Sequence, residues 1–172
     1  MKQIAVVILN WNGAALLERF LPAVLKNSGE MAHIYVADNG STDSSIILLK
    51  EQFPQVTIIE MPHNNGFAGG YNLALQQISE PLFCLLNSDV SPAENWLVPI
   101  LTAFNSDAQL AIAQPKILDE LKKTHFEYAG AAGGYLDALS KRNTSLLMNI
   151  QAPVAQKISV LSLYWPRSCS MC

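Results

Sequence analysis

The stretch IAVVILNWNG (residues 4–13) decides the fold of this 172-residue chain. Its first six residues form a continuous apolar run rich in β-branched side chains, which predicts a strand buried on both faces. The run breaks at the polar segment NWNG, and apolar residues then recur at helical spacing from Leu16 to Leu25. A buried strand followed at once by an amphipathic helix is typical of the first unit of a parallel α/β sheet.

The alternation of strand and helix continues to about residue 113. Further strands are predicted at 33–37, 56–60, 82–86 and 110–113, and helices at 16–25, 41–53, 68–78 and from about 92 to 104. Ser41 or Thr42 is expected to cap the second helix, and residues 91–94 have the pattern of a capping box for the fourth. Pro22 predicts a kink or a restart in the first helix. The expected fold class is α/β, an open, mostly parallel sheet with flanking helices.

Composition restricts the class of protein. Half of the residues are hydrophobic and 15% are charged, which fits one globular domain and argues against disorder. The net charge is −3 and no basic run occurs, so we expect no nucleic-acid partner. No apolar run approaches a transmembrane length, and the N-terminus lacks the features of a signal peptide. Three cysteines give no even disulfide framework, so we expect a reduced, cytoplasmic protein.

Polar clusters follow the first, second and fourth predicted strands. They read NWN (10–12), DNGSTD (38–43) and NSD (87–89). In an open parallel sheet the carboxyl ends of the strands share one edge, and ligands bind there, where the strand order reverses. The sequence therefore predicts that these three clusters meet in one binding site.

Each cluster also has a structural interpretation. Asp43 and Ser41 fit turn and cap roles better than ligand binding, whereas Asp38 follows its strand directly and can accept hydrogen bonds from a base or a ribose. Trp11 is equally suited to stacking on a base and to filling the core. Asp89 either belongs to the loop before the fourth helix or binds a divalent cation, because Mg²⁺ is held by one or two carboxylates together with substrate phosphates.

A glycine-rich stretch, NNGFAGGYN (64–72), opens the third predicted helix. Close packing of this helix on the sheet and contact of its first amides with a phosphate are about equally consistent with the glycines. The spacing is not G-x-G-x-x-G, and the stretch follows the third strand rather than the first. A dinucleotide-dependent dehydrogenase is therefore disfavoured.

Four motifs together resemble the family 2 glycosyltransferases with the GT-A fold, and more narrowly their rhamnosyltransferase-like bacterial members. The motifs are VVILNWNG (6–13), VADNGSTDSS (36–45), NNGFAGGYNLAL (64–75) and LLNSDV (85–90), and the resemblance extends to YAGAAGGYLDAL (128–139). It implies that residues 1–139 are the nucleotide-binding half of a GT-A (Rossmann-like) domain. The implied reaction is transfer of a sugar from a nucleotide-diphosphate donor to an acceptor hydroxyl.

The resemblance also implies donors, acceptors and a location. The subgroup favours dTDP-rhamnose or a UDP-sugar as donor and a saccharide or a lipid-linked glycan as acceptor, in cell-surface polysaccharide biosynthesis. The protein would then work in the cytoplasm, either free or in peripheral association with the inner face of the membrane, with no transmembrane segment of its own.

The family's site residues carry over position by position. Asn10, Trp11 and Asn12 would surround the base, Asp38 would bind the base or ribose, and Asn64, Gly66 and Gly69 would line the donor side. The D-x-D-like segment reads Asn87-Ser88-Asp89, so the resemblance implies Asp89 as the ligand of Mg²⁺ or Mn²⁺ and Asn87 as its neighbour in the nucleotide site. The cation would neutralise the departing diphosphate.

Residues 140–172 form an atypical tail. All 14 acidic residues lie at or before Asp137, and the tail contains only basic charges. In the family the general base is a carboxylate in the second half of the domain, so no position here receives that role and we assign none. We expect transfer activity to be absent or very low, and the alternative function is a non-catalytic nucleotide-sugar-binding module.

Two hypotheses account for the tail. One is a truncated gene product whose end is read in a shifted frame, and the other is a natural, divergent extension. Translation of the other two reading frames would distinguish them, because only the first predicts a hidden acidic transferase-like segment. A truncated sheet would leave apolar surface uncovered, which predicts marginal stability or self-association.

Overall fold

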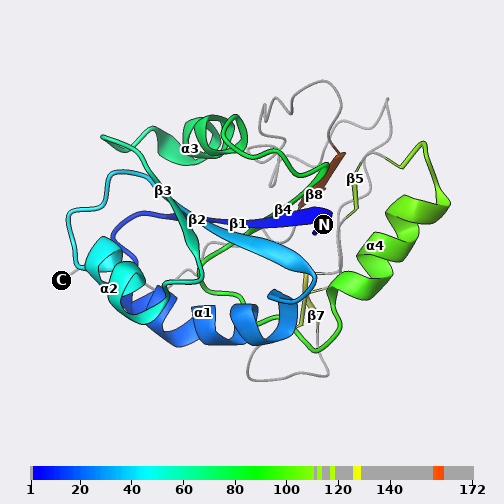
Figure 1. Cartoon of the computed structure of the whole chain (residues 1–172), viewed down its shortest axis with the longest axis horizontal. Helices are drawn as coiled ribbons and strands as arrows, with labels where there is room; N and C mark the ends of the chain where they lie inside the picture. Colours follow the sequence, from blue (N-terminus) through cyan, green and yellow to red (C-terminus); the bar gives the residue numbers. More distant parts are fainter. Residues whose placement is uncertain (1, 111, 114–116, 119–125, 129–156, 161–172) are drawn as a thin grey trace.

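A computed structural model of the chain shows the expected α/β architecture (Figure 1). It describes residues 2–110, 112–113, 117–118, 126–128 and 157–160. The domain boundary predicted at residue 139 lies outside these ranges, so it stays a prediction.

The main sheet has the strand order β3-β2-β1-β4-β8-β5, and its pairings are parallel. Its strands are β1 (Ile4–Asn10), β2 (Ala32–Asp38), β3 (Thr57–Glu60), β4 (Leu82–Leu86), β5 (Ile112–Ala113) and β8 (Lys157–Val160). A separate antiparallel pair consists of β6 (Ile117–Leu118) and β7 (Phe126–Tyr128). The order of the first four strands reverses direction between β1 and β4, which places the switch point of the sheet there.

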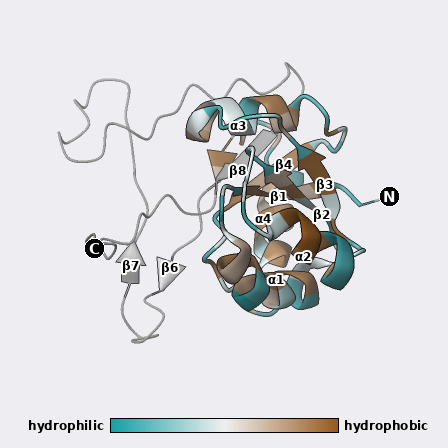
Figure 2. Ribbon diagram, turned by 90° about the vertical axis from the view of Figure 1, so that its left-hand side faces the viewer, coloured by the Kyte–Doolittle hydropathy of each residue, from teal (hydrophilic) through white to brown (hydrophobic). Residues whose placement is uncertain are grey.

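Helices cover both faces of the sheet (Figure 2). One face carries α1 (Ala14–Ser28), α2 (Ser45–Gln52) and α4 (Leu97–Ser106), and the other carries α3 (Gly66–Leu75). Two hydrophobic clusters result, one on each side of the strands. The continuous apolar runs of the sequence thus belong to strands buried on both faces, as predicted.

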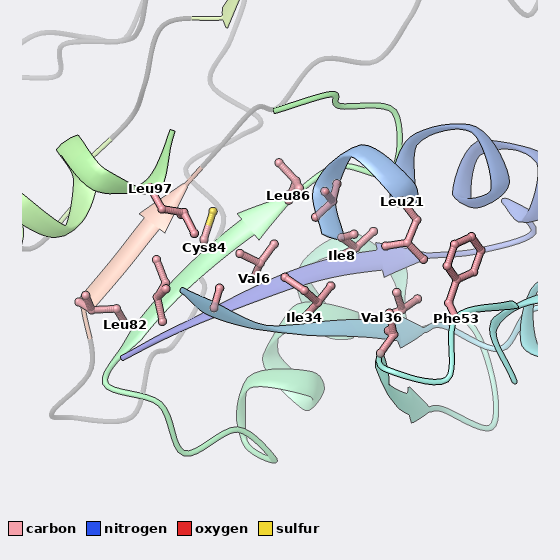
Figure 3. Close-up of a cluster of buried hydrophobic side chains, with 14 of the residues drawn as sticks. Val6, Ile8, Leu21, Ile34, Val36, Phe53, Leu82, Cys84, Leu86 and Leu97 are labelled. Carbon is pink, nitrogen blue, oxygen red and sulfur yellow. The ribbon is translucent and has the colours of Figure 1, made fainter. Parts of the chain in front are cut away.

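Alternation along β1 divides its side chains between the two clusters. Val6 and Ile8 point into the larger cluster, where Ile34, Cys84 and Leu97 join them (Figure 3). Ala5 and Val7 face α3 instead. Full burial of an aliphatic side chain such as Val6, Val7 or Ile8 stabilises the fold by about 1.5–3 kcal/mol. Because β1 contributes to both clusters, it is the centre of the core.

The helix boundaries differ from the predictions in four places. The second helix begins at Ser45 with Ser44 as its N-cap, so the predicted caps Ser41 and Thr42 are wrong. Their backbone amides are instead bonded to Asp38 and Asn12. The first helix runs without a restart through Pro22, which lies exposed inside it.

The third and fourth helices were also misplaced. α3 begins at Gly66 and ends at Leu75, whereas 68–78 was predicted. The predicted capping box at 91–94 is wrong, because α4 begins only at Leu97. Tertiary hydrogen bonds hold the segment before α4: Asn27 Nδ2 donates to Pro92 O at 2.7 Å and Trp96 Nε1 donates to Ser28 Oγ at 2.9 Å.

In the part of the tail that the structure describes, a strand occurs that the sequence did not predict. β8, residues 157–160, pairs with β4 on one side and β5 on the other. It therefore extends the sheet beyond the switch point.

Candidate nucleotide and metal site

The three polar clusters lie at the same edge of the sheet. Asn10 and Asp38 are register partners at the ends of β1 and β2. Leu86, the last residue of β4, follows the same register opposite Ile8, and Asn87 to Asp89 come directly after it. The predicted convergence of the strand ends is confirmed, and it occurs at the switch point.

Asp38 is buried and held by two hydrogen bonds. It is 3% exposed, its Oδ1 accepts from Asn10 Nδ2 at 2.9 Å, and its Oδ2 accepts from the Ser41 amide at 2.9 Å. Asn10 Nδ2 also donates to Ser41 Oγ at 3.2 Å. A carboxylate has about four acceptor sites, so two protein bonds fix Asp38 and leave capacity for a ligand.

The buried amide of Asn10 requires glycine at position 13. Asn10 Oδ1 has no hydrogen-bond partner, and a Cβ on Gly13 would lie 2.4 Å from it. Gly13 is therefore needed for the first turn of α1 to pass over Asn10. The link between Asn10 and Asp38 depends on this close approach.

Asn12 connects the loops that follow β1 and β2. It has a left-handed backbone, with φ of 51°, and its amide donates to Ser41 Oγ at 2.8 Å. Its Oδ1 accepts from the Thr42 amide at 2.7 Å and from the Asp43 amide at 3.3 Å. The backbone amide and the side-chain oxygen of Asn12 are thus both engaged within the protein.

Asp43 has the cap role that its pattern favoured. Its Oδ2 accepts from the Ala14 amide at the start of α1, and its Oδ1 accepts from the Ser45 amide at the start of α2, both at 3.0 Å. Partial burial opposes ionisation, but the hydrogen bonds from Ser45 and Ala14 outweigh it, so the pKa of Asp43 lies below its ordinary value. One carboxylate therefore orders the starts of two helices.

Trp11 is an aromatic residue at this edge. Its side chain is 57% exposed, which rules out the interpretation that it fills the core. It lies between Asn10 and Asn12, whose side-chain bonds fix the backbone on either side. An exposed ring on an ordered loop is suited to stacking on a planar ligand.

The glycine-rich loop meets this edge from the α3 side. Asn64 Oδ1 accepts from the Gly66 amide at 2.8 Å and from Asn39 Nδ2 at 2.9 Å. A Cβ at Gly69 would lie 3.2 Å from Asn65 Cβ, so Gly69 packs against its own loop. Asn64 and Gly66 are exposed and Gly69 is half-buried, and the donor-side role predicted for all three stays a prediction.

Asn39 lies in the DNGSTD cluster, but the sequence predicted no role for it. It is 2% exposed and bonded to the loop at 64–66. The only sequence signal was its position directly after a strand-ending Asp. Its partners lie 25 or more residues away, so no local pattern could assign them.

The segment after β4 has the oxygen donors that a hard cation prefers. Asn87 and Asp89 are half-buried. Within the described ranges no group of three His, Cys, Asp or Glu side chains gathers into a metal cage. A single carboxylate with oxygen neighbours fits Mg²⁺ or Mn²⁺ only if substrate phosphates complete the coordination, which is the usual arrangement for Mg²⁺.

Tyr71 is bonded to the last residue of β4, directly before the Asn87–Asp89 segment. Its hydroxyl donates to Leu86 O at 3.1 Å, and its fully buried ring packs edge-on against Phe67. Burial raises the pKa of Tyr71 far above its ordinary value, so the hydroxyl remains a donor. The residue that precedes Asn87 is thereby fixed.

Surface depressions occur at the opposite edge of the sheet. One is lined by Lys2, Gln3, Glu30, Met31 and Leu101. Lys2 and Met31 precede β1 and β2, so this depression adjoins the amino ends of the strands and is separate from the polar edge.

Among the residues the structure describes, every helix is too short or too polar to cross a bilayer.

In open parallel α/β sheets, ligands bind at the switch point outside the carboxyl ends of the strands, and the polar clusters of this chain lie at that position. The profile of the family described as glycosyl transferase family 2 matches residues 5–153, so the chain belongs to that family. The match continues past residue 139, where the sequence motifs ended. The rhamnosyltransferase-like subgroup is not distinguished by this match and stays a prediction.

Two curated relatives are each much longer than this chain. The teichoic acid poly(glycerol phosphate) polymerase of Staphylococcus epidermidis is 23% identical over an alignment of 154 residues that covers 83% of this chain and 21% of the polymerase. An uncharacterized glycosyltransferase of Nostoc sp. is 31% identical over 90 residues, which are 51% of this chain and 28% of that protein. The chain thus spans about a quarter of these relatives.

Solved structures confirm the GT-A, Rossmann-like fold. The mannosyltransferase PcManGT of Pyrobaculum calidifontis, in complex with GDP-Man and Mn²⁺, aligns with a TM-score of 0.60 and 21% identity over 67% of this chain and 36% of its own. Staphylococcus aureus TarS 1–349 in complex with UDP-GlcNAc aligns with a TM-score of 0.60 and 15% identity over 69% of this chain and 35% of its own.

Proposed function

We propose that this chain binds the nucleotide-diphosphate sugar in a glycosyltransferase reaction of cell-surface polysaccharide synthesis. The observation that carries the proposal is the meeting of three strand ends at the switch point, which brings the buried Asp38, the exposed Trp11 and the Asn87–Asp89 segment to one edge. Family membership supports the reaction class.

Each cluster has a part in binding the donor. Trp11 stacks on the base, Asp38 accepts hydrogen bonds from the base or ribose, and the loop of Asn64 and Gly66 lies along the donor. Asp89, with Asn87 beside it, would hold Mg²⁺ or Mn²⁺. When bound, the cation neutralises negative charge on the diphosphate as the sugar leaves.

The donor and acceptor are proposed at the level of class. GDP-Man with Mn²⁺ and UDP-GlcNAc are bound by the two solved relatives, which supports a nucleotide-sugar donor here. Our proposed donors are dTDP-rhamnose or a UDP-sugar, and the acceptor is a saccharide or a lipid-linked glycan. A lipid-linked acceptor would place the reaction at the inner face of the cytoplasmic membrane.

A second function, nucleotide-sugar binding without transfer, is favoured by one observation. Residues 138–172 contain no Asp or Glu that could serve as general base. We therefore propose that this 172-residue form transfers sugar slowly or not at all. A radiolabelled transfer assay with panels of donors and acceptors tests this, and turnover by the purified chain would refute it.

The binding proposal is tested at Asp89. Isothermal titration with UDP and dTDP in the presence of Mn²⁺ measures the affinity of the unchanged chain, and EDTA is expected to abolish it. Asp89→Ala should weaken binding by roughly tenfold or more, because it removes the carboxylate that holds the cation. Asp107→Asn at the end of α4 is the matched control and should bind normally. Equal affinity of Asp89→Ala and the unchanged chain would contradict the metal role.

A further inference from the structure

Asn39 occupies the centre of the polar edge. Its side chain is 2% exposed, and its backbone amide donates to Asn10 O at 2.8 Å. The next backbone bond along this edge runs from the Met61 amide to Asp38 O at 2.9 Å. The chain around Asn39 is therefore fixed to the ends of both neighbouring strands.

The side chain of Asn39 uses its polar atoms within the protein. Nδ2 donates to Asn64 Oδ1 at 2.9 Å and to Gly66 O at 3.0 Å, and Oδ1 accepts from the Asn65 amide at 2.9 Å. An asparagine amide has two N–H donors and one carbonyl, so both donors are engaged and the carbonyl is bonded too. Any effect of Asn39 on a ligand must therefore pass through the loop it holds.

The surroundings of the loop differ on its two sides. A Cβ on Gly70 would lie 3.0 Å from Asn39 Nδ2 and 2.8 Å from Leu9 Cδ1, so α3 packs directly against the amide. A Cβ on Gly66 would meet nothing within 4 Å. The loop is thus held from the inside by Asn39 and open on its outer side.

We infer that Asn39 is a positioning residue for donor binding, which fixes the loop of Asn64 and Gly66 relative to Asp38. This inference rests on the proposed function. Asn64 and Gly66 face the donor in one arrangement only while Asn39 holds them, and a preformed loop avoids the entropy cost of ordering at each binding event.

The first test compares Asn39→Ala with a structural control. Glu80→Gln perturbs a buried residue that contacts His33 and, at 3.2 Å, the Tyr35 hydroxyl, next to the amino ends of β2 and β4. Both variants should melt at lower temperature, but only Asn39→Ala should bind UDP and dTDP with Mn²⁺ roughly tenfold more weakly. Hydrogen exchange of the Asn65 and Gly66 amides should accelerate in Asn39→Ala alone.

A double variant separates positioning from general damage. Because Asn39 acts through Asn64, the double variant Asn39→Ala/Asn64→Ala should bind the nucleotide no more weakly than whichever single variant has the lower affinity. Asn39→Asp keeps the side-chain volume and the acceptor for Asn65 but loses both donors, so it should also weaken binding if the alanine variant fails to fold.

The outcomes distinguish the two proposals. If the unchanged chain binds no nucleoside diphosphate, the proposed function fails, and the donor-binding role of Asn39 fails with it. If the unchanged chain binds and folded Asn39→Ala or Asn39→Asp binds equally well, only the inference about Asn39 is overturned. Unchanged exchange at Asn65 and Gly66, or additive losses in the double variant, would overturn it as well.

Discussion

Trp11 combines an exposed ring with a backbone held on both sides. Because 57% of its side chain is exposed, Trp11→Ala should change the free energy of unfolding by less than about 0.5 kcal/mol. Loss of base stacking should nevertheless weaken nucleotide binding by about 1–3 kcal/mol. Titration with UDP and with inorganic pyrophosphate checks this, because pyrophosphate has no base. Equal losses for both ligands would contradict a stacking role.

Gly13 shows how one hydrogen atom in place of a methyl group maintains the site. The Cβ of Gly13→Ala would lie 2.4 Å from Asn10 Oδ1. The substitution should therefore lower the free energy of unfolding, measured by urea denaturation, by about 1–3 kcal/mol. In an Asn10→Ala background the obstacle is gone, and the same substitution should cost little. An undiminished cost in that background would place the strain elsewhere.

At the scale of elements, α1 depends on a cap from outside its own sequence. Asp43→Asn removes one of the two oxygen acceptors used by Ala14 and Ser45, and should lower the free energy of unfolding at neutral pH by about 1 kcal/mol. The pKa of Asp43 is lowered from 3.8 in the folded chain, so this stabilisation is present above 3.8 and is lost as the pH falls through the lower folded-state pKa. Denaturation curves of both proteins should converge in acid, and a constant difference would exclude ionisation of Asp43 as the cause.

Strands were easier to predict from the sequence than the starts of helices. β1 and β4 are buried on both faces, so continuous apolar runs mark them directly. The start of α4 depends on distant partners, since Trp96 donates to Ser28, 68 residues away. Short-range capping patterns such as residues 91–94 carry no information about such contacts.

The candidate site, too, has features that the sequence predicted and features that it did not. Topology alone places strand ends at one edge, so the proximity of Asn10 to Asp38 followed from the order of strands. Whether Trp11 is buried or exposed depends on the three-dimensional packing, and the sequence left both interpretations equal. Asn39 was missed because its bonds join loops that are 25 to 27 residues apart.

At the scale of the whole molecule, the tail decides how far the sheet extends. β8 lies between β4 and β5, so residues 157–160 cover an edge of β4 that would otherwise have unpaired backbone groups. The expectation of marginal stability assumed that a truncated sheet is left uncovered, and β8 covers part of that edge. Marginal stability itself stays a prediction. The pairing of β8 also gives the atypical tail a structural part that its composition did not suggest.

Substitutions at Ser159 test whether β8 stabilises the sheet, because the neighbours of Ser159 in register are Cys84 of β4 and Ala113 of β5. Proline has no backbone N–H and is not tolerated in a strand with partners on both sides, so Ser159→Pro should lower the free energy of unfolding by about 3 kcal/mol. Ser159→Val keeps the amide and is the matched control, and urea denaturation compares the two. If both variants unfold at the same urea concentration, β8 contributes nothing to the fold.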